Sequence, residues 1–264
     1  MKNLFSVEGK IVLVTGGSRG IGEMIAAGFL ANGAKVYISS RKSDACASTV
    51  ERLVKEYGGF CEALPADLSG LDGIQSLVNN LSKKEKALDV LVNNAGVSWG
   101  APLEDYPEIG WDKVMNTNVK GVFYLTQKLI PLLKENANND DPSRVINIGS
   151  IDGIRGGTFD AHAYGPSKAA LHSLTKEMAS RLVKDDIIVN AIAPGPFPTW
   201  MLSTGVGFGG ETDVDWDIVG KGVPRKRVGT PEDIAGLAIF LASRAGAFTV
   251  GDIITCDGGI ISTP

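Results

Sequence analysis

Cysteine and histidine are scarce in this sequence. Its 264 residues include three cysteines, Cys46, Cys61 and Cys256, and two histidines, His162 and His172. The cysteines are spaced for neither a disulfide framework nor a metal site, so we expect free thiols in a reducing compartment, the cytoplasm. Because no cluster of ligands surrounds the two histidines, we also expect no bound metal.

The sequence also lacks a run of more than three basic residues. Lys and Arg number 26 and Asp and Glu 30, and this net charge of −4 argues against a nucleic-acid or anionic-membrane partner. The start of the chain reaches Glu8 too early to hold a secretory signal. The uncharged stretch 187–210 contains Pro194, Pro196 and Pro198, which would break a helix crossing a bilayer. We therefore expect no membrane span.

Short apolar runs alternate with longer amphipathic stretches along the whole chain, which is typical of a parallel sheet with helices on both faces. We expect a single domain over residues 1–264, of the α/β class, with a doubly wound sheet of about seven parallel strands. The expected strands are 11–14, 36–38, 61–64, 90–92, 145–148, 187–192 and 253–256, and the expected helices are 21–32, 43–57, 71–86, 110–134, 162–184 and 231–243.

Residues 200–224 form a glycine-rich segment without clear periodicity. Long irregular segments in compact domains are usually functional or disordered. This one carries apolar anchors such as Trp200, Phe208 and Trp216 among its glycines. That composition suits a lid that closes over a substrate. The alternative is a mobile surface loop with incidental aromatic residues.

A glycine-rich turn, 15–22, joins the first expected strand to the first expected helix. Glycines let the backbone turn sharply, and the free N–H groups at the helix start then face an anion. This context predicts a Rossmann-type dinucleotide site, although a merely tight turn is the alternative. The candidate cofactor-binding residues in it are Gly16, Ser18, Arg19, Gly20, Ile21 and Gly22.

The end of the second expected strand indicates which dinucleotide binds. An Asp or Glu there would accept hydrogen bonds from the ribose 2′-hydroxyl of NAD and would repel a 2′-phosphate. This chain has Ser39, Ser40, Arg41 and Lys42 instead. Arg41, with Ser40 and Arg19, can bind a phosphate through charge-assisted hydrogen bonds, so we expect NADP (NADPH). The alternative is a solvated helix start.

Tyr164 and Lys168 stand four residues apart and therefore share one face of a helix. An ammonium beside a phenol favours the phenolate, so we expect the pKa of Tyr164 to fall from about 10 towards neutrality. Such a group can donate and accept protons. Taken alone, a Tyr and a Lys at this spacing are commonly a surface pair.

Together these motifs resemble the short-chain dehydrogenase/reductase family, and the resemblance covers essentially the whole chain. Within that family, 98–101, 150–151 and 194–201 look most like NADPH-dependent β-ketoacyl reductases. The segments that carry the resemblance are 15–22, Asn93-Asn94-Ala95-Gly96, Asn118-Val119-Lys120-Gly121, Asn147 to Ser150, Tyr164 to Lys168, Asn190 to Gly195, Arg227 to Asp233 and Asp257-Gly258-Gly259.

The resemblance implies a cofactor that lies across the carboxyl ends of the strands. Asp67 and Leu68 would flank the adenine, and Lys168 would bind the nicotinamide ribose beside Tyr164. The residues implied at the ribose and phosphates are Asn94, Ala95 and Gly96, and those at the nicotinamide are Pro194, Gly195, Phe197 and Thr199.

The resemblance also implies four catalytic residues. Tyr164 would give a proton to a substrate carbonyl, Ser150 would bond the developing alkoxide, and Asn118 would hold a water next to Lys168. Ser150 lies fourteen residues before Tyr164, one more than is commonest in the family, so we expect an extra residue in this loop. The alternative for Asn118 is a helix-interior residue that bonds its own backbone.

The sequence therefore predicts an NADPH-dependent ketoreductase acting on a ketone or β-ketoacyl compound, a small-molecule substrate. One alternative is an NADP-dependent secondary-alcohol or hydroxysteroid dehydrogenase that works in the oxidative direction, and a remote one is a non-catalytic nucleotide-sensing protein. The family also implies a homodimer or homotetramer, paired through helices 110–134 and 162–184, where Phe123, Leu171 and Leu174 look exposed. Asp152 and His162 are either substrate contacts or solvated loop residues.

Overall fold

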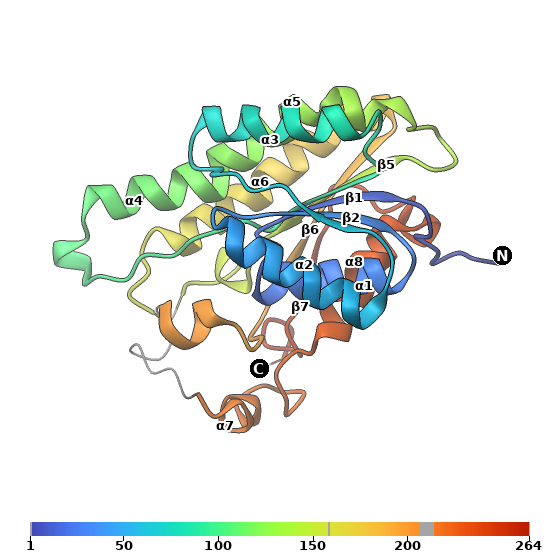
Figure 1. The fold of residues 1–264 in the computed structure, drawn as a ribbon. Coiled ribbons are helices and arrows are strands. Elements are labelled where there is room, and N and C mark those ends of the chain that lie inside the picture. The colour runs from blue at the N-terminus through green and yellow to red at the C-terminus, as the bar shows by residue number, and fades with distance from the viewer. Residues whose placement is uncertain (1, 158, 206–213, 264) are drawn as a thin grey trace.

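In the computed structural model, which describes residues 2–157, 159–205 and 214–263, the strands form one parallel sheet. Its order is β3-β2-β1-β4-β5-β6-β7, with seven strands in the described part of the chain (Figure 1). The predicted fold class is confirmed. The strands are β1 (Ile11–Thr15), β2 (Lys35–Ser39), β3 (Cys61–Ala63), β4 (Val90–Asn93), β5 (Ser143–Ile148), β6 (Ile187–Pro194) and β7 (Ile253–Cys256).

Helices cover both faces of the sheet. On one face lie α1 (Gly20–Ala31), α2 (Ser43–Tyr57) and α8 (Pro231–Ala242), and on the other α3 (Leu71–Lys84), α5 (Gly121–Glu135) and α6 (Tyr164–Leu182) (Figure 1). Successive residues of a strand point to opposite faces. Val12 and Val14 of β1 therefore join the core under α1 and α8, whereas Leu13 joins the core under α3, α5 and α6. Because both faces are covered, most strand residues are apolar.

Two expected elements differ from the structure. The helix predicted over 110–134 is divided into α4 (Glu108–Met115) and α5 by a π-helical turn, Asn116–Lys120. Within 200–224, where we expected no secondary structure, a π-helical turn covers Met201–Gly205 and α7 covers Trp216–Lys221. These pieces are too short to show a helical period in sequence. Residues 206–213 of the predicted lid, including Phe208, lie outside the described residues.

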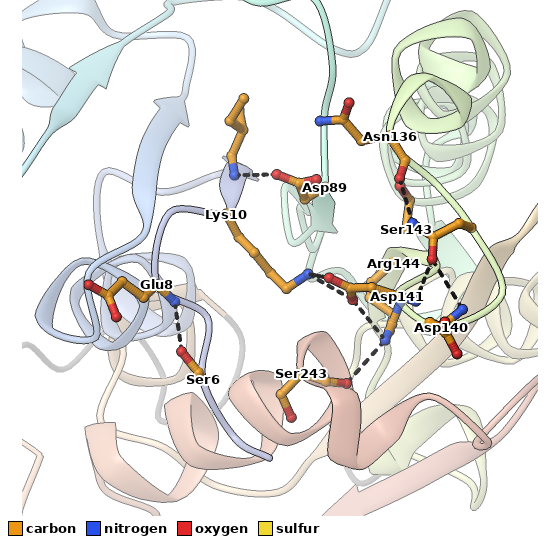
Figure 2. Close-up of polar contacts among 12 residues, drawn as sticks. Ser6, Glu8, Lys10, Asp89, Asn136, Asp140, Asp141, Ser143, Arg144 and Ser243 are labelled. Carbon is orange, nitrogen blue, oxygen red and sulfur yellow. Dashed lines mark hydrogen bonds and ion pairs between the residues drawn. The ribbon is translucent and has the colours of Figure 1, made fainter. Parts of the chain in front are cut away.

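Polar contacts hold the amino ends of β1 and β5 (Figure 2). Lys10 Nζ lies 2.8 Å from a carboxylate oxygen of Asp141. The buried Arg144 donates from Nη2 to the Ser243 carbonyl oxygen and from Nε to the Leu241 carbonyl oxygen, each at 3.1 Å. These contacts stabilise the side of the sheet where β1 and β5 begin. The site lies on the opposite side, at the carboxyl ends of the strands.

The strand order reverses direction at β1, between β2 and β4. In open parallel sheets, ligands bind outside the carboxyl ends of the strands at such a point. The residues predicted to bind a cofactor follow the carboxyl ends of β1, β2, β3, β4 and β6. In the described ranges, no helix combines the length and apolar character that a membrane span needs.

Candidate active site

The glycine turn after β1 has the backbone that an anion site requires. Gly16 and Gly20 have φ values of 65° and 58°, a region that side chains disfavour. A Cβ at Gly22 would lie 2.3 Å from Asn94 Nδ2, so only glycine fits there. Helix α1 begins at Gly20, and no side chain caps its first turn. The free N–H groups of that turn fit a phosphate.

Thr15 and Asn94 hold this turn against β4. Thr15 Oγ1 accepts hydrogen bonds from the main-chain N–H groups of Asn94 and Ala95, both at 3.0 Å. The Asn94 side chain donates to the carbonyl oxygens of Thr15 at 2.9 Å and Gly16 at 3.2 Å. Asn94 therefore positions the glycine turn. The sequence analysis missed the role of Thr15, although it opens the quoted motif.

The residues predicted to select the nucleotide lie at the ends of β2 and β3. Arg41 is exposed, and its charge acts on Asp67. Burial raises the pKa of Asp67, but hydrogen bonds from Ser69 and the charge of Arg41 outweigh it and leave the pKa below its usual value. Ser40 Oγ lies 3.0 Å from Cys46 Sγ. An exposed guanidinium thus stands where NAD-binding chains place an acid.

Other predicted cofactor residues lie around these two groups. The Arg19 guanidinium lies 4.4 Å from the centroid of the Trp200 ring. The Ser18 carbonyl accepts a bond from Thr49 at 3.0 Å, and Ile21 packs against the core. Leu68 is buried.

Tyr164, Ser150 and Lys168 come together at the start of α6. The Ser150 hydroxyl lies close enough to the Tyr164 phenol to lower its pKa. Lys168 Nζ lies 5.5 Å from the centroid of the Tyr164 ring and donates to the Ile148 carbonyl oxygen at 2.8 Å. A short 3₁₀ turn, Ile151–Gly153, follows Ser150, whose Oγ accepts from the Asp152 N–H at 3.1 Å. This loop keeps Ser150 within reach of Tyr164 at the fourteen-residue spacing.

The predicted direction of the Tyr164 pKa shift was wrong. Burial, followed by the charge of Asp152, raises the pKa to about 12, and the bond to Ser150 lowers it only partly. Burial also lowers the pKa of Lys168 to about 8. The sequence analysis considered the ammonium alone and omitted desolvation, which disfavours both charged forms. The phenol is therefore held protonated, ready to donate.

Asn118 lies in the π-helical turn between α4 and α5, fully buried. Its Oδ1 accepts from the Val97 N–H, and its Nδ2 donates to the Val97 carbonyl, both at 2.9 Å, and to Ser167 Oγ at 3.0 Å. The alternative that it bonds its own helix backbone is wrong. These bonds use both hydrogens of Nδ2, so the side chain has no donor left for a water. Turns of this kind often mark functional sites.

Gly96 faces the space between Asn118 and Lys168. A Cβ at Gly96 would lie 3.4 Å from Asn118 Oδ1 and 3.5 Å from Lys168 Nζ. The absence of a side chain therefore leaves room for a ligand beside Lys168. A phosphorylated dinucleotide fits the room beside Lys168, the glycine turn and the exposed Arg41 taken together.

The segment after β6 reaches the glycine turn from the other side. Pro194 ends the strand, and the Gly195 N–H donates to the Cys256 carbonyl at 3.0 Å. A Cβ at Gly20 would lie 3.3 Å from Thr199 Cγ2, so Thr199 closes over the turn. Phe197 is only 2% exposed and packs in the core, so only its main chain can face a cofactor.

Asp152 and His162 are half-buried rather than fully solvated. Asp152 acts on Tyr164 through its charge. The His162 ring packs edge-on against Tyr106, with ring centroids 5.5 Å apart. Within the described ranges, no group of three or more His, Cys, Asp or Glu side chains could hold a metal ion.

Three comparisons with known proteins each match nearly the full chain. A family model described as enoyl-(acyl carrier protein) reductase matches residues 16–261. The rhamnolipids biosynthesis 3-oxoacyl-[acyl-carrier-protein] reductase of Pseudomonas aeruginosa is 50% identical, over 98% of this chain and 99% of that protein. The 5-keto-D-gluconate 5-reductase of Escherichia coli K12 is 34% identical, over 99% of each chain. The Pseudomonas aeruginosa RhlG/NADP active-site complex has a TM-score of 0.90 and 49% identity, covering 98% of this chain and 99% of that chain.

Proposed function

The chain belongs to the short-chain dehydrogenase/reductase family, and from this premise we propose that it reduces a carbonyl group to a secondary alcohol with NADPH. One observation carries the proposal. Tyr164, Ser150 and Lys168 converge at the carboxyl edge of the sheet, beside a glycine turn shaped for a phosphate. A single dinucleotide-binding and catalytic domain over 1–264 can hold all of these parts.

In this proposal each residue has a separate task. NADPH, when bound, supplies the hydride that reaches the carbonyl carbon. Tyr164 donates its phenolic proton to the carbonyl oxygen, and Ser150 donates a hydrogen bond to the same oxygen as negative charge develops. Hydride and proton together give the alcohol. Lys168 stabilises the remaining phenolate, which regains a proton from solvent through a water held by the main chain of the Asn118 turn.

The state of Tyr164 suits a proton donor. Burial and Asp152 raise its pKa to about 12, so the phenol carries its proton at neutral pH. A protonated phenol can donate to a carbonyl. The same residues serve oxidation in the reverse direction, so the support for the ketoreductase over the oxidative alternative is the 50% identity to a reductase.

NADP is the cofactor, as the RhlG/NADP complex at 49% identity supports. We propose that Arg41 and Ser40 bind its 2′-phosphate, with Arg19 leaving Trp200 to join them, and that Asp67 and Leu68 flank its adenine. The further residues proposed to contact it are those of the glycine turn, Asn94 to Gly96, Tyr164, Lys168 and Pro194 to Thr199.

For the substrate we propose a 3-oxoacyl thioester. The support is the 50% identity to a 3-oxoacyl-[acyl-carrier-protein] reductase over nearly the whole of both chains. The test is NADPH oxidation by the purified protein with 3-oxoacyl thioesters, 5-keto-D-gluconate and cyclic ketones, repeated with NADH. We expect thioester-dependent oxidation with NADPH as the better donor. A preference for the sugar acid would overturn the substrate, and no turnover with any carbonyl would favour a nucleotide sensor.

We also propose that the protein is a homodimer or homotetramer. A hollow of about 410 Å³ lies on α4, the π-helical turn, α5 and α6. Its walls include Phe123, which is 37% exposed, and Leu174. Leu171, which looked exposed in the sequence, is buried in its own fold and takes no part. The free thiols of Cys46, Cys61 and Cys256 suit the proposed cytoplasmic location.

A further inference from the structure

We propose that His172 is a positioning residue that fixes the loop carrying Ser150. The inference rests on the proposed function, in which Ser150 bonds the substrate oxygen. His172 lies on α6, four residues after Lys168 and eight after Tyr164, so it shares the face of the helix that bears the site. No motif in the sequence indicates a catalytic or positioning role for it.

The imidazole of His172 is wedged between two glycines that flank Ser150. The residue is only 8% exposed. A Cβ at Gly149 would lie 2.1 Å from His172 Nε2, and a Cβ at Gly153 would lie 2.9 Å from Cε1. The ring therefore occupies the space that side chains at 149 and 153 would need. It contacts the loop on both sides of the serine.

A hydrogen bond adds direction to this packing. The backbone of Gly153 raises the pKa of His172 as an acceptor for a ring N–H would. Nε2 has no hydrogen-bond partner among the described residues, so we infer that Nδ1 faces the Gly153 carbonyl as the donor. On the other side, the Gly149 N–H donates to the Ile192 carbonyl at 2.7 Å. The loop is thus tied to β6 before Ser150 and to α6 after it.

Burial and the charges around the ring keep the imidazole neutral. Burial, followed by the charges of Lys168 and Lys176, lowers the pKa of His172, and the bond to Gly153 offsets only part of this. The imidazole is therefore neutral at pH 7, with its proton on the nitrogen that faces Gly153. A neutral donor next to Lys168 also avoids repulsion of the ammonium.

Loss of this donor would free the loop. The bond from Gly149 to Ile192 would remain, but the Gly153 side of the loop would lose its tie to the ring, and a glycine there has wide conformational freedom. The serine hydroxyl must stay within hydrogen-bond reach of the oxygen that Tyr164 protonates, and a displacement of about 1 Å can cost roughly a hundredfold in rate. The ring itself touches neither reactant, so its effect passes entirely through Ser150.

Two polar substitutions of His172 distinguish the effect of the Nδ1 hydrogen-bond donor from the effect of filling the space with a side chain. The amide nitrogen of an Asn can take the place of Nδ1, whereas the amide of a Gln reaches the place of Nε2. We expect H172Q to lower kcat about tenfold and H172N to stay within about threefold of the parent. The dissociation constant for NADPH should be unchanged in both. Met178→Ala, a buried change on the same helix that packs in the core away from the loop, is the control for lost stability.

A double-mutant cycle with Ser150→Ala gives the decisive comparison. If His172 acts through Ser150, H172Q should cause no further loss of kcat in the Ser150→Ala background. Equal losses in both backgrounds would overturn the proposal. So would equal losses in H172Q and H172N, or a loss in M178A as large as that in H172Q.

Hydrogen exchange tests the positioning without any substrate. The amides of 149–154 should exchange about tenfold faster in H172Q than in the parent and in M178A. Unchanged exchange there would contradict the proposal even if the proposed carbonyl reduction fails. Conversely, faster exchange in H172Q together with no carbonyl reduction by the parent protein would overturn the proposed function but would support the positioning of the loop by His172.

Discussion

At the scale of single residues, spacing predicted proximity but not ionisation. Tyr164 and Lys168 stand four apart, and helical geometry alone places them on one face. The pKa of Tyr164 moves upwards instead of downwards because burial and Asp152 act on it, and both depend on the folded loop 150–157. The depth of a side chain and its neighbours across a loop cannot be obtained from residue types.

Arg41 is the residue that we expect to select NADPH over NADH. Charge-assisted hydrogen bonds to a phosphate contribute roughly 1.5–3 kcal/mol. Arg41→Asp should therefore raise the KM for NADPH about ten- to a hundredfold and shift the preference towards NADH. Lys42→Asp makes the same change of charge one residue later and should have a much smaller effect. Unchanged selectivity in Arg41→Asp, measured as the ratio of kcat/KM values, would contradict the role of Arg41.

At the scale of elements, the regular helices and strands followed from the sequence and the interruptions did not. The predicted strands fall within two residues of β1 to β7 at each end, because apolar runs between turns define them well. The π-helical turn at Asn118 was missed because its bonds go to Val97 and Ser167, far away in the chain. The six-residue helix α7 is capped by Asp215, whose side chain accepts from the Asp217 and Ile218 N–H groups. That cap was not recognised among the glycines.

The bonds of Asn118 make this turn a testable element. Asn118→Ala would leave the N–H and carbonyl of Val97 without their partners, which should lower the free energy of unfolding by roughly 2–4 kcal/mol. Asn116→Ala, in the same turn but only half-buried, should cost much less. Urea denaturation of both variants measures the difference. Equal losses would show that the turn does not depend on the Asn118 side chain.

At the scale of the whole molecule, the parallel sheet determines where the site lies. The alternating pattern predicted parallel strands, and parallel strands end at a common edge. The glycine turn, Arg41, Asp67, Asn94 and Pro194 follow from that rule. The packing of Phe197 does not, because its ring fits against Gly229, which no local pattern indicates.

Assembly is the whole-molecule prediction. A charge placed in the apolar hollow on α5 would be buried unpaired in a dimer. Phe123→Glu should therefore lower the sedimentation coefficient to that of a monomer of 27.8 kDa. Val54→Glu, at a residue of similar exposure on α2 on the opposite face, should leave the assembly unchanged. A Phe123→Glu variant that still sediments as the parent would exclude this surface as the interface.

The central claim is that the Tyr164 phenol gives the proton to the substrate oxygen. The most direct test removes only that hydroxyl, in Tyr164→Phe, and compares carbonyl-dependent NADPH oxidation with NADPH binding measured by fluorescence. General acid catalysis contributes typically 10²–10⁴-fold. We predict a loss of kcat of at least about a hundredfold with a nearly unchanged dissociation constant for NADPH. A variant that retains more than about a tenth of the parent kcat would contradict the account.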